Sequence, residues 1–298
     1  MKDFCGLVSI VGRPNVGKST LLNRLIEQKI SITSRKSQTT RNNILGIKTK
    51  DNHQMVFIDT PGVHINASKV MNKVLNQSAL GAIEDADLII FMLQRNKINT
   101  LDELILERLK GIKTKKLCVI NKLDQVASKN SLLPVIEKLR SEYDFAEIIP
   151  VSAKTGKNIN ELENMICQNL PENNHLYDSE TKFLAKESFM ISEIIREKII
   201  RFLGEELPHE TYVQLQKLED KENIINIDAE IIVARESQKG IVVGKNGAKL
   251  KKIGEKARID LEKFFNKKVF LKTWVKTKKN WNNDSDFISS LGIGSLYD

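Results

Sequence analysis

The sequence has few of the residues that build disulfide frameworks, metal clusters or membrane spans. Its three cysteines, Cys5, Cys118 and Cys167, are scattered and odd in number, which indicates a reduced chain without disulfides. Its four histidines show no metal-ligand spacing. The longest strongly apolar run, about 88–93, is too short to cross a bilayer, and no signal peptide precedes the first apolar segment. We therefore expect a soluble cytoplasmic protein.

The positive charge is concentrated in one part of the chain. Residues 239–279 carry 14 Lys and Arg against three acidic residues, a net charge of +11, whereas the other residues sum to −2. The length of 298 residues is enough for two domains. A basic block of this size predicts contact with a polyanion, and RNA is the polyanion that we expect.

A glycine-rich loop near the N-terminus predicts a nucleoside triphosphate site. The loop has the pattern G-x-x-x-x-G-K-[ST], follows an apolar run at 6–11 and precedes a helix-like segment at 19–26. Its backbone N–H groups converge on phosphate oxygens, its lysine reaches the β- and γ-phosphates, and its serine hydroxyl holds Mg²⁺. The predicted phosphate-binding residues are Gly12, Arg13, Pro14, Asn15, Val16, Gly17, Lys18, Ser19 and Thr20.

The motif N-K-x-D at 121–124 predicts that the base is guanine. Asp124 can accept two hydrogen bonds from the N–H groups on one edge of guanine, which adenine lacks. Lys122 would lie along the base plane, and Asn121 would tie this loop to the phosphate loop. A short loop after the apolar run at 148–150 would contact the guanine carbonyl. The predicted guanine-binding residues are Asn121, Lys122, Asp124, Ser152, Ala153 and Lys154.

Two further segments are predicted to sense the γ-phosphate. Switch I comprises Gln38, Thr39, Thr40, Arg41 and Asn42, and switch II comprises Asp59, Thr60, Pro61, Gly62 and Val63. The predicted Mg²⁺ ligands are Ser19, Thr40 and Asp59. Val63 stands where many GTPases carry a water-orienting glutamine, so we expect slow unaided turnover. Asn15 either coordinates K⁺ beside the phosphates or hydrogen-bonds within its loop.

The basic block contains a second motif. The pattern after residue 184 predicts the element order αββααβ, with a helix at 186–203, strands at 212–218, 224–234 and 269–275, and a G-x-x-G turn between two helices. Such a turn holds about four single-stranded nucleotides in KH domains. The predicted RNA-binding residues are Gly244, Lys245, Asn246, Gly247, Lys249, Lys251 and Lys252.

Taken together, these motifs resemble the Era family of bacterial GTPases over about residues 3–280. The segments that carry the resemblance are GRPNVGKST, SITSRKSQTTRN, DTPGVH, NKLD, VSAKTGKNI, FLGEELPHE, IVVGKNGAKLKKIG and the tail with Trp274 and Trp281. The resemblance implies an α/β P-loop GTPase domain at 1–172 with a doubly wound, mostly parallel sheet. A linker at 173–183, an α+β type II KH domain at 184–279 and a C-terminal tail at 280–298 would follow.

The resemblance also implies ligands and partners. A monomer would bind GTP or GDP with Mg²⁺, bind the 3′ end of 16S rRNA, act in assembly of the 30S small ribosomal subunit, and contact the inner membrane peripherally. Two features depart from the family pattern, Leu93-Gln94-Arg95 and the tail beyond Asn283, and neither is expected to affect nucleotide contacts.

Three other interpretations stay open. A related P-loop GTPase that modifies tRNA would need a different N-terminal domain and a terminal cysteine motif. In a membrane-associated switch, the basic block would bind anionic lipid. In an RNA-binding scaffold, GTPase activity would be vestigial.

Overall fold

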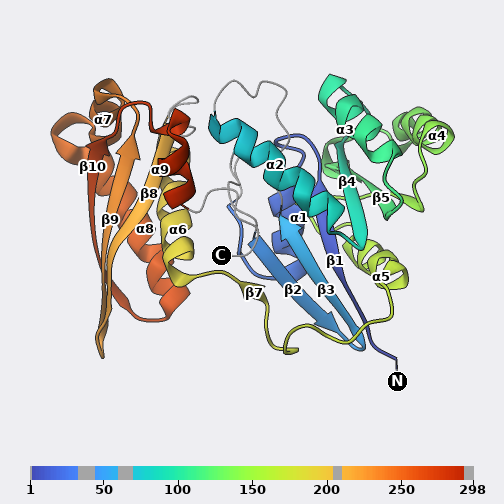
Figure 1. Ribbon diagram of the computed structural model, residues 1–298, viewed down its shortest axis with the longest axis horizontal. Helices are drawn as coiled ribbons and strands as arrows, with labels where there is room; N and C mark the ends of the chain where they lie inside the picture. The colour runs from blue at the N-terminus through green and yellow to red at the C-terminus, as the bar shows by residue number, and fades with distance from the viewer. Residues whose placement is uncertain (1, 33–43, 60–69, 204–209, 292–298) are drawn as a thin grey trace.

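The computed structural model describes residues 2–32, 44–59, 70–203 and 210–291. Figure 1 shows two lobes, one containing α1 to α5 and the other containing α6 to α8, with β7 on the connection between them. Each lobe has its own hydrophobic core. This arrangement agrees with the two domains expected from the sequence.

The first lobe contains a seven-stranded sheet in the order β6-β5-β4-β1-β3-β2-β7. Strands β6, β5, β4, β1 and β3 are parallel, whereas β2 and β7 run antiparallel to their neighbours. The predicted mostly parallel sheet is thus confirmed. The strands are β1 (Phe4–Val11), β2 (Ile44–Lys50), β3 (His53–Asp59), β4 (Leu88–Gln94), β5 (Lys115–Asn121), β6 (Glu147–Pro150) and β7 (Phe183–Leu184).

Helices cover both faces of this sheet. The helices of this lobe are α1 (Lys18–Ile26), α2 (Val70–Glu84), α3 (Thr100–Lys110), α4 (Leu133–Glu142) and α5 (Ile159–Asn169). On β4, Ile90 packs into the core beneath α1 and α5, while its neighbour Phe91 packs into the core beneath α2, α3 and α4. Because both faces are buried, β4 reads as a continuous apolar run rather than an alternating one.

The second lobe has the predicted order αββααβ. Its elements are α6 (Glu187–Phe202), β8 (Thr211–Asp220), β9 (Ile224–Val233), α7 (Glu236–Val243), α8 (Ala248–Phe265) and β10 (Lys268–Thr277). The sheet order is β10-β9-β8, with β9 and β10 parallel and β8 and β9 antiparallel. One face of the sheet packs on α6 and α8 in a core that includes Ile195, Ile227 and Leu261.

The segment 173–183, expected as a linker, is held against the first lobe. Gln54 is fully buried on β3, and its Oε1 accepts hydrogen bonds from the backbone N–H groups of Leu176 and Tyr177 at 2.8 and 3.0 Å. A buried polar side chain requires such partners, and here the connecting segment supplies them. The chain then adds β7 to the edge of the sheet beside β2.

The described part of the C-terminal tail also has a defined place. A 3₁₀ turn (Trp281–Asn283) and α9 (Ser285–Ser290) follow β10. Trp281 is fully buried and lies in one hydrophobic cluster with Ile288 of α9 and with Met71 and Leu75 of α2. In Figure 1, α9 (red) lies beside α2 (cyan), and the tail thereby contacts the helix that follows the predicted switch II.

Candidate functional site

The predicted nucleotide-binding residues of the first lobe meet at the carboxyl edge of its parallel sheet. The glycine-rich loop follows β1, Asp59 ends β3, Asn121 ends β5 and Ser152 follows β6. In open α/β sheets this edge is where ligands bind, because successive strand ends and helix N-termini converge there.

Asn121 connects three of the loops at this edge. Its Nδ2 donates to the Val16 carbonyl oxygen at 2.8 Å, so the expected tie to the phosphate loop is present. Its Oδ1 accepts a hydrogen bond from the Ala153 backbone N–H at 3.0 Å. Gly17 has φ 109°, and a Cβ there would lie 2.3 Å from Asn121 Nδ2. Any side chain at Gly17 would therefore displace the residue that aligns the loops.

Lys18 lies buried inside the phosphate loop. Its Nζ donates to the carbonyl oxygens of Gly12 and Arg13 at 2.9 and 3.2 Å. Burial lowers the pKa of Lys18 to about 8, although the Asp59 carboxylate opposes this effect. A phosphate bound in the loop would raise that pKa again, since it would place negative charge beside the ammonium group.

Ser19 and Asp59 form a compact set of oxygen atoms. Ser19 Oγ donates to Asp59 Oδ2 at 3.0 Å, and Ser31 Oγ donates to the same oxygen at 2.7 Å. Asp59 is fully buried. Hydroxyl and carboxylate oxygens are the ligands that Mg²⁺ prefers, so this pair fits the predicted metal.

The rest of the predicted switches falls on residues that lie outside the described parts of the chain. These are Gln38, Thr39, Thr40, Arg41 and Asn42 of switch I and Thr60, Pro61, Gly62 and Val63 of switch II.

Three side-chain hydrogen bonds hold the loop that is predicted to bind guanine. Asp124 lies exposed at the rim, and its Oδ1 accepts a hydrogen bond from Ser152 Oγ at 2.6 Å. Lys122 Nζ donates to the Asn15 carbonyl oxygen at 2.7 Å and to Gln94 Oε1 at 2.8 Å. Gln94 therefore positions a predicted nucleotide-binding residue. The departure from the family pattern at 93–95 therefore touches a predicted nucleotide-binding residue, because β4 and β5 end side by side. That it leaves the nucleotide contacts themselves unchanged stays a prediction.

Sequence reasoning missed two residues that support the site. Arg24 on α1 donates from Nε to the Ala153 carbonyl oxygen at 3.2 Å and from Nη2 to the Lys154 carbonyl oxygen at 2.7 Å. Asp102, fully buried at the start of α3, pairs with Arg13 Nε at 3.1 Å. Burial raises the pKa of Asp102, and the Arg13 guanidinium opposes that rise.

The pairing with Asp102 changes what Arg13 can contribute. Its side chain is directed to α3, so its backbone is the part available to a phosphate. The capping box that Asn99 and Asp102 form was a signal in the sequence for the start of α3, though not for its partner in the phosphate loop.

The G-x-x-G turn of the second lobe joins α7 to α8. Gly244 has φ 72° and ψ 177°, and a Cβ there would lie 2.7 Å from Lys249 Cβ. Gly247 has φ 76°, with no atom within 4 Å of the Cβ position. Lys245 and Asn246 between them are exposed. The turn thus presents open backbone flanked by lysines, and Lys251 and Lys252 lie exposed on the first turns of α8.

In the described residues, no helix is long and apolar enough to cross a membrane.

Comparisons with known proteins cover both lobes. Residues 7–122 match a family described as 50S ribosome-binding GTPase, and residues 206–282 match the KH domain family. GTPase Era of Actinobacillus pleuropneumoniae serotype 5b (strain L20) is 46% identical over 292 residues, which is 98% of this chain and 96% of that protein. GTPase Era of Coxiella burnetii (strain Dugway 5J108-111) is 47% identical over 290 residues, 97% of this chain and 98% of that protein.

Two solved structures resemble the whole chain. A crystal structure of Era in complex with MgGDPNP and nucleotides 1506–1542 of 16S ribosomal RNA has a TM-score of 0.94 and 35% identity, over 97% of this chain and 99% of that one. A crystal structure of a variant of Aquifex aeolicus Era bound to GDP·AlF4⁻ has a TM-score of 0.93 and 35% identity, over 98% and 99% of the two chains. Identity at this level over nearly the full length, together with the same two domains in the same order, shows that the chain belongs to the Era family of GTPases.

Proposed function

We propose that this GTPase binds the 3′ end of 16S rRNA under the control of its bound nucleotide and acts in assembly of the 30S subunit. The observation that carries the proposal is the division of labour between the lobes. The first lobe gathers the phosphate, Mg²⁺ and guanine motifs at one sheet edge, and the second presents an exposed G-x-x-G turn in a block of net charge +11.

The relatives support 16S rRNA as the partner. The description that names the 50S subunit belongs to a family matched by residues 7–122 alone. The Era structure that contains 16S nucleotides matches 97% of the chain, including the KH domain. Because KH domains hold single-stranded nucleic acid at such a turn, we assign RNA binding to the part of the chain that carries the G-x-x-G turn.

In the nucleotide site, each described residue has a role that its contacts support. Lys18 would exchange its two backbone carbonyl partners for phosphate oxygens. Ser19 and Asp59 would hold Mg²⁺, with Thr40 as the third protein ligand. Asp124 would accept the two guanine N–H groups while Ser152 keeps the carboxylate in place. The metal would supply charge neutralisation for phosphoryl transfer.

Asn15 is our proposed ligand for K⁺. It lies exposed at the mouth of the phosphate loop with φ 66°, and the Lys122 ammonium holds its carbonyl oxygen. A monovalent cation there would add positive charge beside the phosphates. We expect K⁺ in place of Na⁺ to raise GTP hydrolysis in the parent protein and not in Asn15→Ala. An equal response in both proteins would contradict this assignment.

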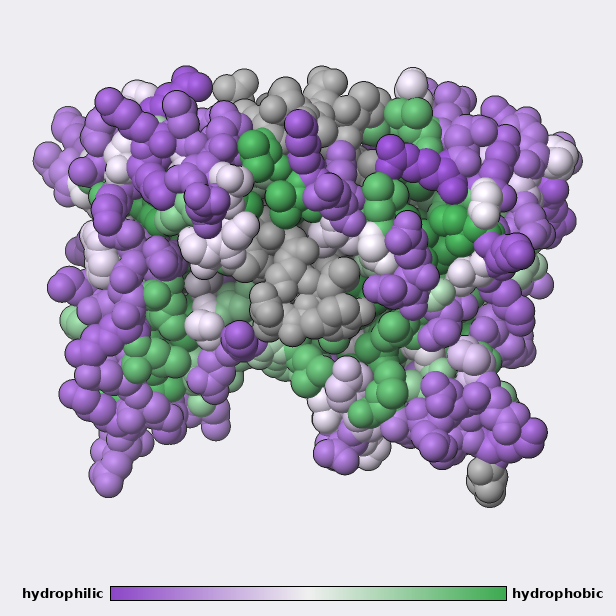
Figure 2. Space-filling model, viewed as in Figure 1, coloured by the Kyte–Doolittle hydropathy of each residue, from purple (hydrophilic) through white to green (hydrophobic). Residues whose placement is uncertain are grey.

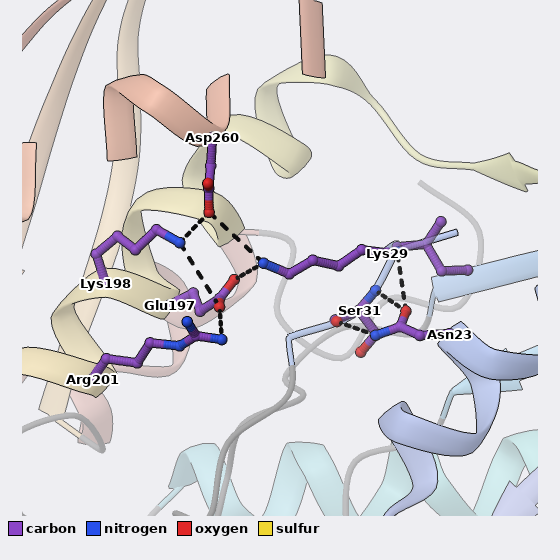
Figure 3. A network of polar contacts seen from close by, with 8 residues as sticks. Asn23, Lys29, Ser31, Glu197, Lys198, Arg201 and Asp260 are labelled. Carbon is purple, nitrogen blue, oxygen red and sulfur yellow. Dashed lines mark hydrogen bonds and ion pairs between the residues drawn. The ribbon is translucent and has the colours of Figure 1, made fainter. Parts of the chain in front are cut away.

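A network of charges links the two lobes near the predicted Mg²⁺ site. Lys29 Nζ lies 2.6 Å from Glu197 Oε2 on α6 and 3.8 Å from Asp260 Oδ2 on α8 (Figure 3). Glu197 and Lys198 are buried. Within the same network, Lys198 pairs with Asp260 and Arg201 pairs with Glu197.

The lobe-to-lobe contact continues into the nucleotide site. Asn23 Oδ1 accepts hydrogen bonds from the backbone N–H groups of Ile30 and Ser31, both at 2.9 Å, so the segment after Lys29 is fixed to α1. Ser31 Oγ in turn donates to Asp59. A shift of Asp59 at the predicted Mg²⁺ site would therefore act on Ser31, which is two residues from Lys29 and its ion pair with the KH domain. This connection supports nucleotide control of RNA binding.

The test is a fluorescence titration of a labelled RNA with the sequence of the 16S 3′ end. We expect the protein to bind this RNA more tightly with a non-hydrolysable GTP analogue than with GDP. Equal affinity in the two nucleotide states would remove the switch while leaving RNA binding intact. Binding to anionic vesicles in place of RNA would favour the membrane-associated switch, and the peripheral membrane contact stays a prediction until that measurement.

A further inference from the structure

The edge strand of the KH sheet carries a regular pattern on the face that points away from the helices. Positions alternate along β10, and Val269, Leu271 and Val275 pack into the core with α6 and α8. Because side chains alternate across a strand, the intervening positions lie on the opposite face. These positions, which we call the β10 stripe, are Lys268, Phe270, Lys272, Trp274 and Lys276.

The stripe combines exposed lysines with aromatic rings. Lys268, Lys272 and Lys276 are exposed, and Phe270 between the first two is 57% exposed. The Phe270 ring is therefore accessible to a flat partner between two cations. Trp274 Nε1 donates to Glu230 Oε1 at 2.9 Å, and Lys272 Nζ lies 5.9 Å from the centre of the indole ring. The indole is therefore held in place on the sheet face.

We propose that the β10 stripe is a second binding surface for single-stranded RNA, with a base stacked on Phe270 and phosphates beside its flanking lysines. This inference rests on the RNA-binding function proposed above and extends it beyond the G-x-x-G turn. Aromatic rings that alternate with lysines are suited to RNA, because every base has a face that stacks and every nucleotide carries a phosphate.

The stripe lies on a strand that neighbours the helix leading into the turn, on the opposite face of the sheet from that helix. The helix α7, which leads into Gly244, packs against β10. Among the described strands β10 has one neighbour, β9, so its other edge lies at the margin of the sheet. An RNA strand held at the turn would therefore reach the stripe by passing around this free edge of β10.

The charge distribution favours an RNA strand over a lipid surface. The register places Lys272 opposite Asp228 and Trp274 opposite Glu230, so the neighbouring strand is acidic. Lys276 Nζ lies 3.8 Å from Glu230 Oε1. Apart from Lys217 of β8, which lies opposite Asp228 and pairs with Glu219, the lysines of this sheet face lie along β10. A flat anionic membrane would also meet the acidic residues of β9. Hydrophilic residues cover most of the KH half of the surface in Figure 2.

The first test uses two single-stranded RNAs and tryptophan fluorescence. One RNA has about four nucleotides, enough to fill the G-x-x-G turn, and the other has about twelve. The chain has two tryptophans and Trp281 is fully buried, so quenching by RNA reports on Trp274. We expect the longer RNA to bind the parent more tightly and to quench its fluorescence.

Substitutions then separate the stripe from the turn. Phe270→Ala should weaken binding of the long RNA by about tenfold, the loss of one stacked base, and leave the short RNA unaffected. The matched control is Leu133→Ala, since Leu133 on α4 is 53% exposed and lies in the other lobe. It should bind both RNAs as the parent does. A fluorescence-monitored melting curve checks that both variants are folded.

The salt dependence of RNA affinity tests the lysines of the β10 stripe independently of Phe270. Changing the three lysines of the stripe to Gln should reduce the slope of log affinity against log salt by about 2, because each phosphate contact on a single strand contributes about 0.7. The control changes three exposed lysines of the first lobe to Gln: Lys97, Lys113 and Lys115. It should leave the slope unchanged.

The outcomes distinguish this inference from the proposed function. If the parent binds neither RNA, the proposed RNA-binding function fails. If the parent binds both RNAs equally, or Phe270→Ala binds the long RNA as tightly as the parent, the stripe is not an RNA surface while the turn still is. Quenching of Trp274 by phosphatidylglycerol vesicles and not by RNA would overturn the inference in favour of a membrane contact.

Discussion

The predicted phosphate-binding sites of the two lobes differ in how far their residues are buried. In the first lobe, Lys18, Asp59, Asn121 and Ser152 are all buried, and hydrogen bonds between loops fix their positions. In the second, Lys245 and Asn246 of the G-x-x-G turn and the nearby Lys251 and Lys252 are exposed, in a segment of net charge +11. We therefore expect recognition in the first lobe to depend on the fixed positions of buried groups, and recognition in the second to depend on charge and on access to the backbone.

Because of this contrast, we expect the two sites to respond differently to substitutions and to salt. A buried polar network loses function when one member is removed, because its partners are left without hydrogen bonds. An exposed basic surface loses affinity gradually with each charge and weakens as salt screens it. The following substitutions test whether the two lobes differ in this way.

The largest effect is expected for Lys18→Ala. It removes the ammonium group that is enclosed by the Gly12 and Arg13 carbonyl oxygens, and we expect GTP affinity to fall by about 100-fold or more. RNA affinity measured without nucleotide should change by less than about twofold. Isothermal titration with GTP provides the measurement, with Lys97→Ala as the exposed control. Unchanged GTP binding in Lys18→Ala would mean that the loop is not the phosphate site.

Asp124→Asn should change the base that the first lobe accepts. The amide cannot accept both guanine N–H groups, so GTP should bind on the order of 30- to 100-fold more weakly. Xanthosine triphosphate should bind the variant better than GTP, because a carbonyl replaces the amino group that Asp124 recognises. Competition between the two nucleotides measures this exchange, and equal GTP affinity in parent and variant would refute the base assignment.

Gly244→Asp with Gly247→Asp should weaken RNA binding by at least about thirtyfold, since two carboxylates would face the RNA backbone. GTP affinity should stay the same. Two substitutions at Gly247, to Asp and to Asn, separate the effect of charge from that of shape. Gly247 is chosen because a Cβ there has open space, whereas a Cβ at Gly244 would lie too close to Lys249. Gly247→Asn has the shape of Gly247→Asp without its charge. If both weaken RNA binding equally, the second lobe depends on backbone access more than on charge.

GTP affinity should depend on pH, because burial lowers the pKa of Lys18. Its pKa is about 8 in the nucleotide-free protein, and bound phosphates would raise it. Below pH 8 the lysine is protonated in both states, so affinity should be nearly constant. Above pH 8 binding must take up a proton, and affinity should fall by up to about tenfold per pH unit. Lys18→Arg, which stays charged throughout, should show no such fall at Lys18. A parent profile that is flat to pH 9.5 would contradict the pKa shift.

The smallest effect is expected where the lobes meet. Lys29→Ala removes the ion pair with Glu197, in which the lysine is half exposed, so its own contribution is modest. We expect the ratio of RNA affinities with GTP analogue and with GDP to change by about two- to threefold. The titration of labelled RNA in both nucleotide states measures that ratio. An unchanged ratio would place the coupling elsewhere, with the contact of α9 and α2 as the next segment to alter.

Much of this molecule could be predicted from sequence. The phosphate loop, the end of β3 and the end of β5 were recognised because phosphate and guanine demand particular residue types at strand ends. The order αββααβ was recognised because alternation at 224–234 and a glycine turn between helices are local patterns. In both cases, the signal lies within a few neighbouring residues.

What the sequence alone determined was therefore the chemistry of each lobe, since local spacing and residue type are sufficient for it. Tertiary structure alone decided which distant residues support that chemistry: Asp102 with Arg13, Gln94 with Lys122, and Glu197 with Lys29. It also decided which face of β10 carries the lysines and rings, because packing on α6 and α8 takes the other face. Such pairings depend on where strand ends and helix faces meet in space, and no spacing along the chain encodes that meeting.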